Sequence, residues 1–192
     1  MARAPGREER VEQRRQRIID VARERAESGG WARVTTRALA DAIGYTQPVL
    51  YGHFPGGKAE IMTAVALTGF AELTDSIRAA LNGRSGRDAT TAAAEAYLDF
   101  AAAHPAVYEA MFSLPIEATF AQAGNEPELQ SGFLALGAAL GTAGAQTPAL
   151  TEVFWGALHG ISQLERTGRQ RPEHRGERVR QLAERFGPAS TG

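Results

Sequence analysis

The sequence predicts an all-α fold, and three observations support this prediction. The chain of 192 residues contains 36 alanines and 20 arginines, both of which favour helices. Apolar residues recur at spacings of three and four, and no segment alternates apolar and polar residues as a half-buried strand would. Hydrophobic residues make up 43% of the chain, so it can bury a sizeable core and is not a wholly disordered protein.

The first expected helix covers residues 7–28. Gly29 and Gly30 follow its last apolar residue, and glycine commonly ends a helix. Trp31 is then expected to fold back onto a small core. The apolar residues expected on the inner side of this helix are Val11, Ile18, Val21, Ala22 and Ala26.

Residues 34–54 predict a helix, a tight turn and a second helix. Thr35 is placed to cap the first helix, and Val34 and Leu39 have the spacing of a hydrophobic staple. Gly44 follows the last apolar residue and can adopt the left-handed conformation that turns the chain.

The second helix of this pair is expected to begin after Thr46, which can cap it, with Pro48 in its first turn. Leu50 and Phe54 share its inner face. Its outer face carries no charged residue, which is unusual for a solvated surface and suits contact with base edges in a major groove. The outer residues are Gln47, Val49, Tyr51 and His53.

The remaining sequence predicts a larger helical bundle, so we expect an N-terminal three-helix domain at residues 1–57 and a second domain at 58–192. In the helix that opens the second domain, apolar residues repeat at spacings of four and three from Met62 to Leu81. The expected helices of the bundle cover residues 58–81, 88–103, 105–113, 126–144, 148–167 and 173–186.

Charge is distributed unevenly along the chain, although the formal net charge is only -1. Residues 1–60 hold 11 basic and 8 acidic side chains, residues 61–165 hold 3 and 11, and residues 166–192 hold 7 and 3. A basic head before an acidic middle suggests a polyanion-binding module. The arginines of the tail are interpreted as a solvated or dimer-facing surface, with a second anion site as the alternative. Arg14, Arg15 and Arg17 leave a similar choice between a solvated face and contacts to a nucleic-acid backbone.

Residues 10–63 resemble the DNA-binding end of the TetR family of bacterial transcriptional repressors. The resemblance rests on the Thr-Thr pair at 35–36, the Leu-Ala-Asp-Ala-Ile-Gly run at 39–44 and the Leu-Tyr-Gly-His-Phe run at 50–54. It implies a helix-turn-helix DNA-binding domain in which the outer face of the second helix reads bases. It also implies that Tyr51, His53 and Lys58 hold phosphates, a role that specifies position rather than sequence.

The chemistry of the side chains fits these implied roles. Thr36 and Arg37 begin the first motif helix, where backbone amides and a guanidinium suit a phosphate. Gln47 can pair with adenine, and the methyl groups of Val49 can touch a thymine methyl. The predicted DNA-binding residues are Thr36, Arg37, Thr46, Gln47, Pro48, Val49, Tyr51, His53 and Lys58.

A second resemblance covers residues 86–186 and concerns the C-terminal domain of one branch of the same family, which carries a Trp-His-Gly motif. It rests mainly on Trp155 and on the pair His159-Gly160. It implies a homodimer formed by helices near 148–167 and 173–186, and an unidentified small-molecule effector. The predicted lining residues, for most of which core packing is the alternative, are Phe70, Tyr97, Phe100, Tyr108, Met111, Phe112, Phe120, Trp155 and His159.

The leading hypothesis is a dimeric repressor that binds a palindromic operator and is released by a small, largely apolar ligand. A small helical enzyme using the C-terminal pocket and a ligand-independent architectural DNA-binding protein are the alternatives. We expect no enzymatic activity, since no set of nucleophile, base and orienting group is evident, and we expect no cofactor. We also expect no metal site, since the chain has no cysteine and no two of its four histidines have ligand spacing on one helix. Neither a signal peptide nor a membrane span is evident, so a cytoplasmic location is expected.

Overall fold

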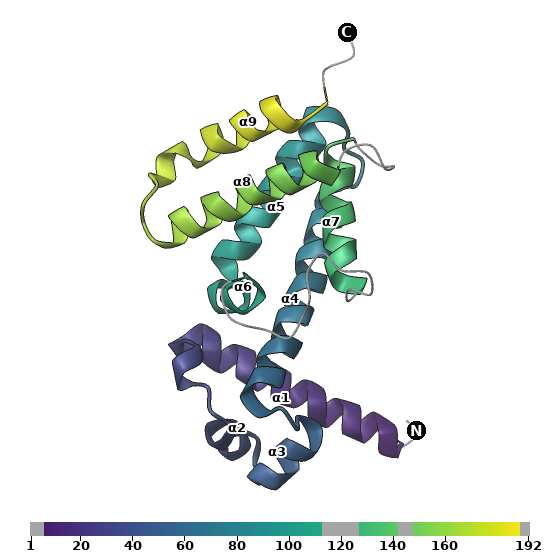
Figure 1. Cartoon of the computed structure of the whole chain (residues 1–192), viewed down its shortest axis with the longest axis vertical. Coiled ribbons are helices and arrows are strands. Elements are labelled where there is room, and N and C mark those ends of the chain that lie inside the picture. Colours follow the sequence, from purple (N-terminus) through teal and green to yellow (C-terminus); the bar gives the residue numbers. More distant parts are fainter. Residues whose placement is uncertain (1–5, 113–126, 142–147, 189–192) are drawn as a thin grey trace. The chain divides into compact units, whose positions relative to one another are not determined.

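The computed structural model describes residues 6–112, 127–141 and 148–188, and over these ranges it contains nine α-helices, two short 3-10 helices and no strand (Figure 1). The all-α prediction is confirmed. None of the helices described has the length and apolar character needed to cross a lipid bilayer. The α-helices are α1 (Arg7–Gly29), α2 (Thr36–Ile43), α3 (Gln47–His53), α4 (Gly57–Leu81), α5 (Gly86–Ala103), α6 (Pro105–Phe112), α7 (Pro127–Ala139), α8 (Pro148–Arg166) and α9 (Arg175–Phe186), and the 3-10 helices are η1 (Trp31–Arg33) and η2 (Pro172–His174).

The chain divides into two compact units. The first consists of Met1–Gly69 with Ala106–Ala118, and the second of Phe70–Pro105 with Thr119–Gly192. Helix α4 therefore contributes to both units, and α6 belongs almost entirely to the first. The division into functional domains between residues 57 and 58 stays a prediction.

In the first unit, α1 packs against η1, α2 and α3, and α2 packs against α3. The apolar faces that the sequence predicted account for this packing. Ile18 and Ala22 of α1, Leu39 of α2 and Leu50 of α3 are all fully buried. Phe54, which follows α3, is fully buried as well.

The first half of α1 differs from the prediction. Val11 was expected on the inner side of the helix, but 45% of it is exposed. The buried positions of α1 begin only at Ile18, and every described residue before it is exposed except the half-buried Arg15. Helical periodicity shows which face of α1 is apolar, but it does not show how far along α1 the helices α2 and α3 pack.

The end of α1 fixes α6 within the first unit. Gly30 adopts a φ of 76°, which turns the chain so that Trp31 is buried as predicted. The indole nitrogen of Trp31 donates a hydrogen bond to the carbonyl oxygen of Ala106, 2.8 Å away. The carboxylate of Glu27 accepts hydrogen bonds from the backbone amides of Ala106 and Val107, at 3.1 and 3.0 Å.

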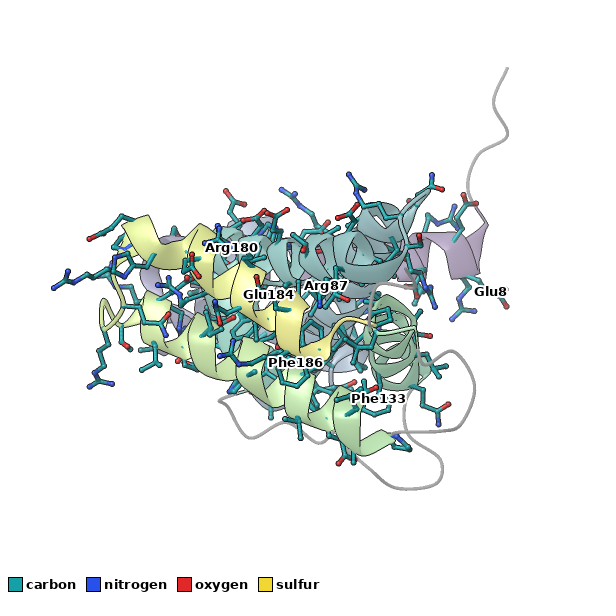
Figure 2. All side chains as sticks on the ribbon, turned by 90° about the horizontal axis from the view of Figure 1, so that it is seen from above. Glu8, Arg87, Phe133, Arg180, Glu184 and Phe186 are labelled. Carbon is teal, nitrogen blue, oxygen red and sulfur yellow. The ribbon has the colours of Figure 1, made fainter. Side chains whose placement is uncertain are left out.

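In the second unit, α5 packs against α7, α8 and α9, and α8 packs against α7 and α9. Figure 2 shows α8 and α9 side by side, with Phe186 near the end of α9. The rings of Phe154 on α8 and Phe186 lie 5.4 Å apart. Helix α7 ends at Ala139, earlier than the expected 144, because Gly141 takes a φ of 68° that ends the helical path.

Two arginines of the tail form ion pairs within the second unit and so are not part of a purely solvated surface. Arg175 lies 2.7 Å from a carboxylate oxygen of Asp99 on α5, and Arg178 lies 2.6 Å from a carboxylate oxygen of Glu165 on α8. These ion pairs join α9 to both helices. Arg180, by contrast, is exposed on α9 (Figure 2). It pairs with Glu177, one turn away on the same helix.

Candidate nucleic-acid interface

Helix α2 begins as the sequence predicted. The hydroxyl oxygen of Thr35 accepts a hydrogen bond from the backbone amide of Ala38 at 3.1 Å, which is the expected side-chain cap. Val34 and Leu39 on either side of this cap are both fully buried. Thr36, the first residue of the helix, is half-buried, and Arg37 is exposed.

The turn between α2 and α3 depends on Gly44. Its φ of 70° and ψ of 28° are left-handed, as predicted, and its amide bonds back to the carbonyls that end α2. Thr46 occupies the position before α3, but its side chain makes no capping hydrogen bond, so the predicted side-chain cap is wrong. Its carbonyl oxygen instead accepts hydrogen bonds from the amides of Val49 and Leu50.

Helix α3 turns an uncharged face outward. Leu50 and Phe54 anchor the helix because both are fully buried. Val49 and Tyr51 are 39% and 44% exposed. Gln47 and Pro48 in the first turn are also exposed, and His53 is half-buried. The expected inner and outer faces are confirmed, while the contacts that each outer side chain makes with DNA stay predictions.

Three parts of the first unit converge where α4 begins. Gly57 has a φ of 62°, and a Cβ atom placed on it would lie 3.2 Å from Cε1 of Tyr51 and 3.7 Å from Cγ2 of Thr36. The structure therefore brings together two predicted phosphate contacts, Thr36 and Tyr51, beside the first turn of α4.

Lys58 lies one residue further along and makes a contact that the sequence did not predict. Its ammonium group donates a hydrogen bond to the carbonyl oxygen of Trp31, 2.5 Å away, and its side chain is half-buried. An ammonium has three N–H donors, so this bond leaves two for an anion. The predicted phosphate contact of Lys58 remains a prediction.

Arg15 is a supporting residue whose role sequence reasoning did not resolve. Its guanidinium donates a hydrogen bond to the carbonyl oxygen of His53 at 3.0 Å and lies 4.2 Å from the centre of the Phe54 ring. It also lies 3.7 Å from the carboxylate of Glu60 on α4. Arg15 therefore holds the end of α3 against α1 and α4. No local pattern separates it from Arg14 and Arg17, which are exposed.

Two parts of the chain match known families. Residues 18–65 match the family described as "Bacterial regulatory proteins, tetR family", and residues 90–186 match "Tetracyclin repressor-like, C-terminal domain". The chain belongs to the TetR family. It is a transcriptional regulator with an N-terminal DNA-binding domain, and both resemblances seen in the sequence agree with that membership.

This TetR-family protein is similar to other bacterial regulators. It is 29% identical over 161 residues to "Uncharacterized HTH-type transcriptional regulator Rv0681" of Mycobacterium tuberculosis. The matched residues cover 80% of this chain and 71% of that protein. It is 36% identical over 93 residues to "Uncharacterized HTH-type transcriptional regulator YobS" of Bacillus subtilis, 48% of each chain.

Solved structures share the fold of this TetR-family protein. A protein of unknown function from Rhodococcus sp. RHA1 superposes with a TM-score of 0.72 and 21% identity, over 90% of this chain and 92% of that chain. The multidrug binding protein EbrR, complexed with imidazole, superposes with a TM-score of 0.68 and 22% identity over the whole of both chains. At these identities the likeness concerns the fold alone.

The residues predicted to line an effector pocket are divided between the units. Phe70, Tyr97 and Phe100 are buried in the second unit, and the indole nitrogen of Trp155 donates a hydrogen bond to the Tyr97 hydroxyl at 3.2 Å. His159 on the same unit is half-buried, and burial, with a smaller effect of Arg166, lowers its pKa below 6.5.

The other predicted lining residues lie elsewhere. Tyr108 and Met111 are buried in the first unit, where the rings of Tyr108 and Phe112 lie 4.7 Å apart. A Cβ atom added to Gly69 would collide with Val107 and Met111, so Met111 packs closely against α4. Phe120 lies outside the described residues. The effector contacts of all these residues stay predictions.

Proposed function

We propose that this protein is a dimeric transcriptional repressor that binds a palindromic operator through α3 of each protomer and is released by a small, largely apolar ligand. Two recognition helices related by a twofold axis reach successive major grooves about 34 Å apart. A ligand releases the operator only if it binds the DNA-incompetent state more tightly, typically by about 1 to 3 kcal/mol.

The uncharged outer face of α3 carries the DNA-binding part of this proposal. The apolar Val49 and the aromatic Tyr51 are both exposed, which is unfavourable in the free protein. Contact with bases and sugars in a major groove would bury them. The buried Leu50 and Phe54 anchor α3 in the core of the first unit. Gln47 at the start of the helix supplies the amide that pairs with a base, and Tyr51 and Lys58 supply phosphate donors.

An outward-facing apolar stripe on α8 supports dimerisation. Val153 and Leu164 are 59% and 39% exposed, and Gly156 and Gly160 lie between them at helical spacing. A Cβ atom added to either glycine meets nothing within 4 Å, so a second helix can approach this stripe closely. The buried residues of α8, such as Phe154 and Leu158, occupy the opposite side of the helix.

The pair formed by Trp155 and Tyr97 supports ligand binding in the second unit. Trp155 and His159 lie four residues apart on α8, and both are half-buried. Aromatic surface with a few polar tips is the composition of a site for a largely apolar ligand. The structural neighbour EbrR is a multidrug binding protein, which is compatible with the same use of the fold.

Sequence selection from a random duplex library tests DNA recognition. We expect the protein to enrich a palindrome, and we expect Gln47→Ala to change the preferred bases while Tyr51→Phe weakens all sequences alike. Adding metabolite extracts to the bound complex then tests for a ligand that releases the duplex. Failure to retard any duplex at low ionic strength would overturn the proposal.

Light scattering tests the dimer. Val153→Glu places a charge on the α8 stripe, so we expect this variant to be a monomer at micromolar concentration. Leu134→Glu, an equal change at an exposed leucine of α7, serves as the matched control and should remain dimeric. A monomeric wild-type protein, or equal dissociation of both variants, contradicts the proposed interface.

A further inference from the structure

The exposed first half of α1 carries a row of arginines. Residues 7–17 are exposed apart from the half-buried Arg15. Residues three and four positions apart on a helix lie on one face. Four arginines follow that spacing, and we call them the arginine row: Arg7, Arg10, Arg14 and Arg17.

Most acidic residues of the same segment lie away from this row. Glu8, Glu9 and Glu12 are never three or four positions from one of its members, so they lie on other sides of the helix. Asp20 is three positions from Arg17, but its carboxylate accepts a hydrogen bond from the side-chain amide of Gln16 at 2.8 Å. Among the residues that the structure describes, Arg7, Arg14 and Arg17 have no acidic side chain within ion-pair distance.

Segregated charge weakens a helix that stands alone. Neighbours within the row are like charges at i,i+3 or i,i+4, which repel each other. In the part of the chain that the structure describes, burial in α1 begins only at Ile18, so the row gains no compensation from burial. A helix face that is only solvated typically interleaves both signs. The pattern fits a surface whose repulsion is relieved by an external polyanion.

The C-terminal end of the row lies at the same level along α1 as the contact between α1 and the proposed recognition helix. Arg15, the neighbour of Arg14 in the sequence, donates a hydrogen bond to the carbonyl oxygen of His53, the last residue of α3. With a rise of 1.5 Å per residue, Arg7 lies about 10 Å further along α1 than Arg14. Duplex DNA carries one negative charge for about every 1.7 Å of its axis. A row of this length therefore spans several phosphates.

We propose that the arginine row is a second, sequence-independent contact with the DNA backbone that extends the footprint of each protomer beyond α3. This inference rests on the proposed function, because α3 must first seat the first unit on a duplex. Guanidinium groups are suited to this role since they pair with phosphate oxygens through two parallel hydrogen bonds.

A salt titration of DNA binding tests the row. In one variant, all four arginines of the row are replaced by glutamine. In the matched control, glutamine replaces four exposed arginines of the second unit, which removes the same net charge. The control positions are Arg78, Arg84, Arg87 and Arg169.

Binding of the selected operator and of an unrelated duplex is measured by fluorescence anisotropy at several salt concentrations. In the row variant, the slope of log K against log salt should become shallower by about 0.9 for each phosphate that the protein no longer neutralises, and the control should keep the wild-type slope. Base preference should stay unchanged, and replacing the row by lysine should restore the slope. Circular dichroism should show retained helix in every variant.

Two outcomes would overturn the inference separately from the proposed function. If the wild-type protein binds its operator but the row variant keeps the wild-type slope, the row does not touch DNA. If the slope becomes equally shallow in the row variant and in the control, only overall charge matters. If the wild-type protein binds no duplex at low salt, the proposed function fails and the inference fails with it.

Discussion

The ammonium group of Lys58 and the carbonyl oxygen of Trp31 lie 2.5 Å apart and form a hydrogen bond that joins the first turn of α4 to η1. Lys58 is the only lysine of the chain. The ammonium group is thus held in place, which would reduce the ordering that the proposed phosphate contact must impose on the side chain.

Replacing Lys58 by methionine should affect both stability and DNA binding. The Trp31 carbonyl also accepts a hydrogen bond from the amide of Val34, so it is not left unpaired. We therefore expect the free energy of unfolding to fall by only about 1 kcal/mol in urea denaturation. The salt slope of DNA binding should also become shallower by about 0.9. An unchanged slope with reduced stability would assign Lys58 a structural role alone.

Replacing Glu27 by glutamine should loosen the start of α6. The two carboxylate oxygens of Glu27 accept hydrogen bonds from the backbone amides of Ala106 and Val107. These amides lie in the first turn of α6, where an amide has no hydrogen-bond partner within its own helix. The amide side chain keeps one acceptor and loses the charge that favours a helix N-terminus, so a loss of about 1 kcal/mol is expected. Hydrogen exchange at Ala106 and Val107 should accelerate.

Glu24→Gln is the matched control for this prediction. Glu24 is an exposed glutamate of the same helix, and its replacement removes the same charge. Exchange at Ala106 and Val107 should stay at the wild-type rate in this variant. Equal acceleration in both variants would indicate a general effect of charge on α1 rather than a specific cap.

Local signals in the sequence predicted most of the fold. The cap at Thr35 and the left-handed glycine at position 44 each depend on residues within one or two turns, and both were recovered. The predicted bounds of α5 and α6 were also close to the observed bounds, because a glycine begins α5 and a proline begins α6. Patterns of this kind specify where a helix lies but not what packs against it.

Contacts between distant residues account for what the sequence did not reveal. The hydrogen bond of Arg15 to His53 spans 38 positions, and that of Trp31 to Ala106 spans 75. Val11 was misplaced for the same reason, because its exposure depends on where α2 and α3 end against α1. The outer face of α3 was predictable because its neighbours Leu50 and Phe54 are apolar at helical spacing.

Replacing Gly57 by alanine should destabilise the protein and disturb the interface. Its φ of 62° is left-handed, and the added Cβ atom would lie 3.2 Å from the ring of Tyr51. We expect a loss of about 1 kcal/mol or more in urea denaturation, together with weaker binding to every duplex as Tyr51 shifts. In the control Gly52→Ala, where the added atom meets nothing within 4 Å inside α3, stability should instead rise by about 0.5 to 1 kcal/mol.

The pH dependence of stability should contain a contribution from His159. Burial, and to a lesser extent the positive charge of Arg166, lower the pKa of this imidazole below 6.5 in the folded protein, whereas the unfolded chain titrates near the ordinary value. Between these two pKa values the unfolded state binds more protons than the folded state. The free energy of unfolding should therefore decrease as the pH falls below about 6.5 and level off below the folded pKa.

Urea denaturation between pH 7.5 and pH 5 measures this contribution. In His159→Gln, the decrease over that range should be smaller than in the wild-type protein, because the neutral amide has no proton to bind. His174→Gln removes a histidine that is exposed in η2, so it should retain the wild-type profile and serves as the control. A His159→Gln profile as steep as that of the wild-type protein would mean that proton uptake on unfolding takes place at other groups.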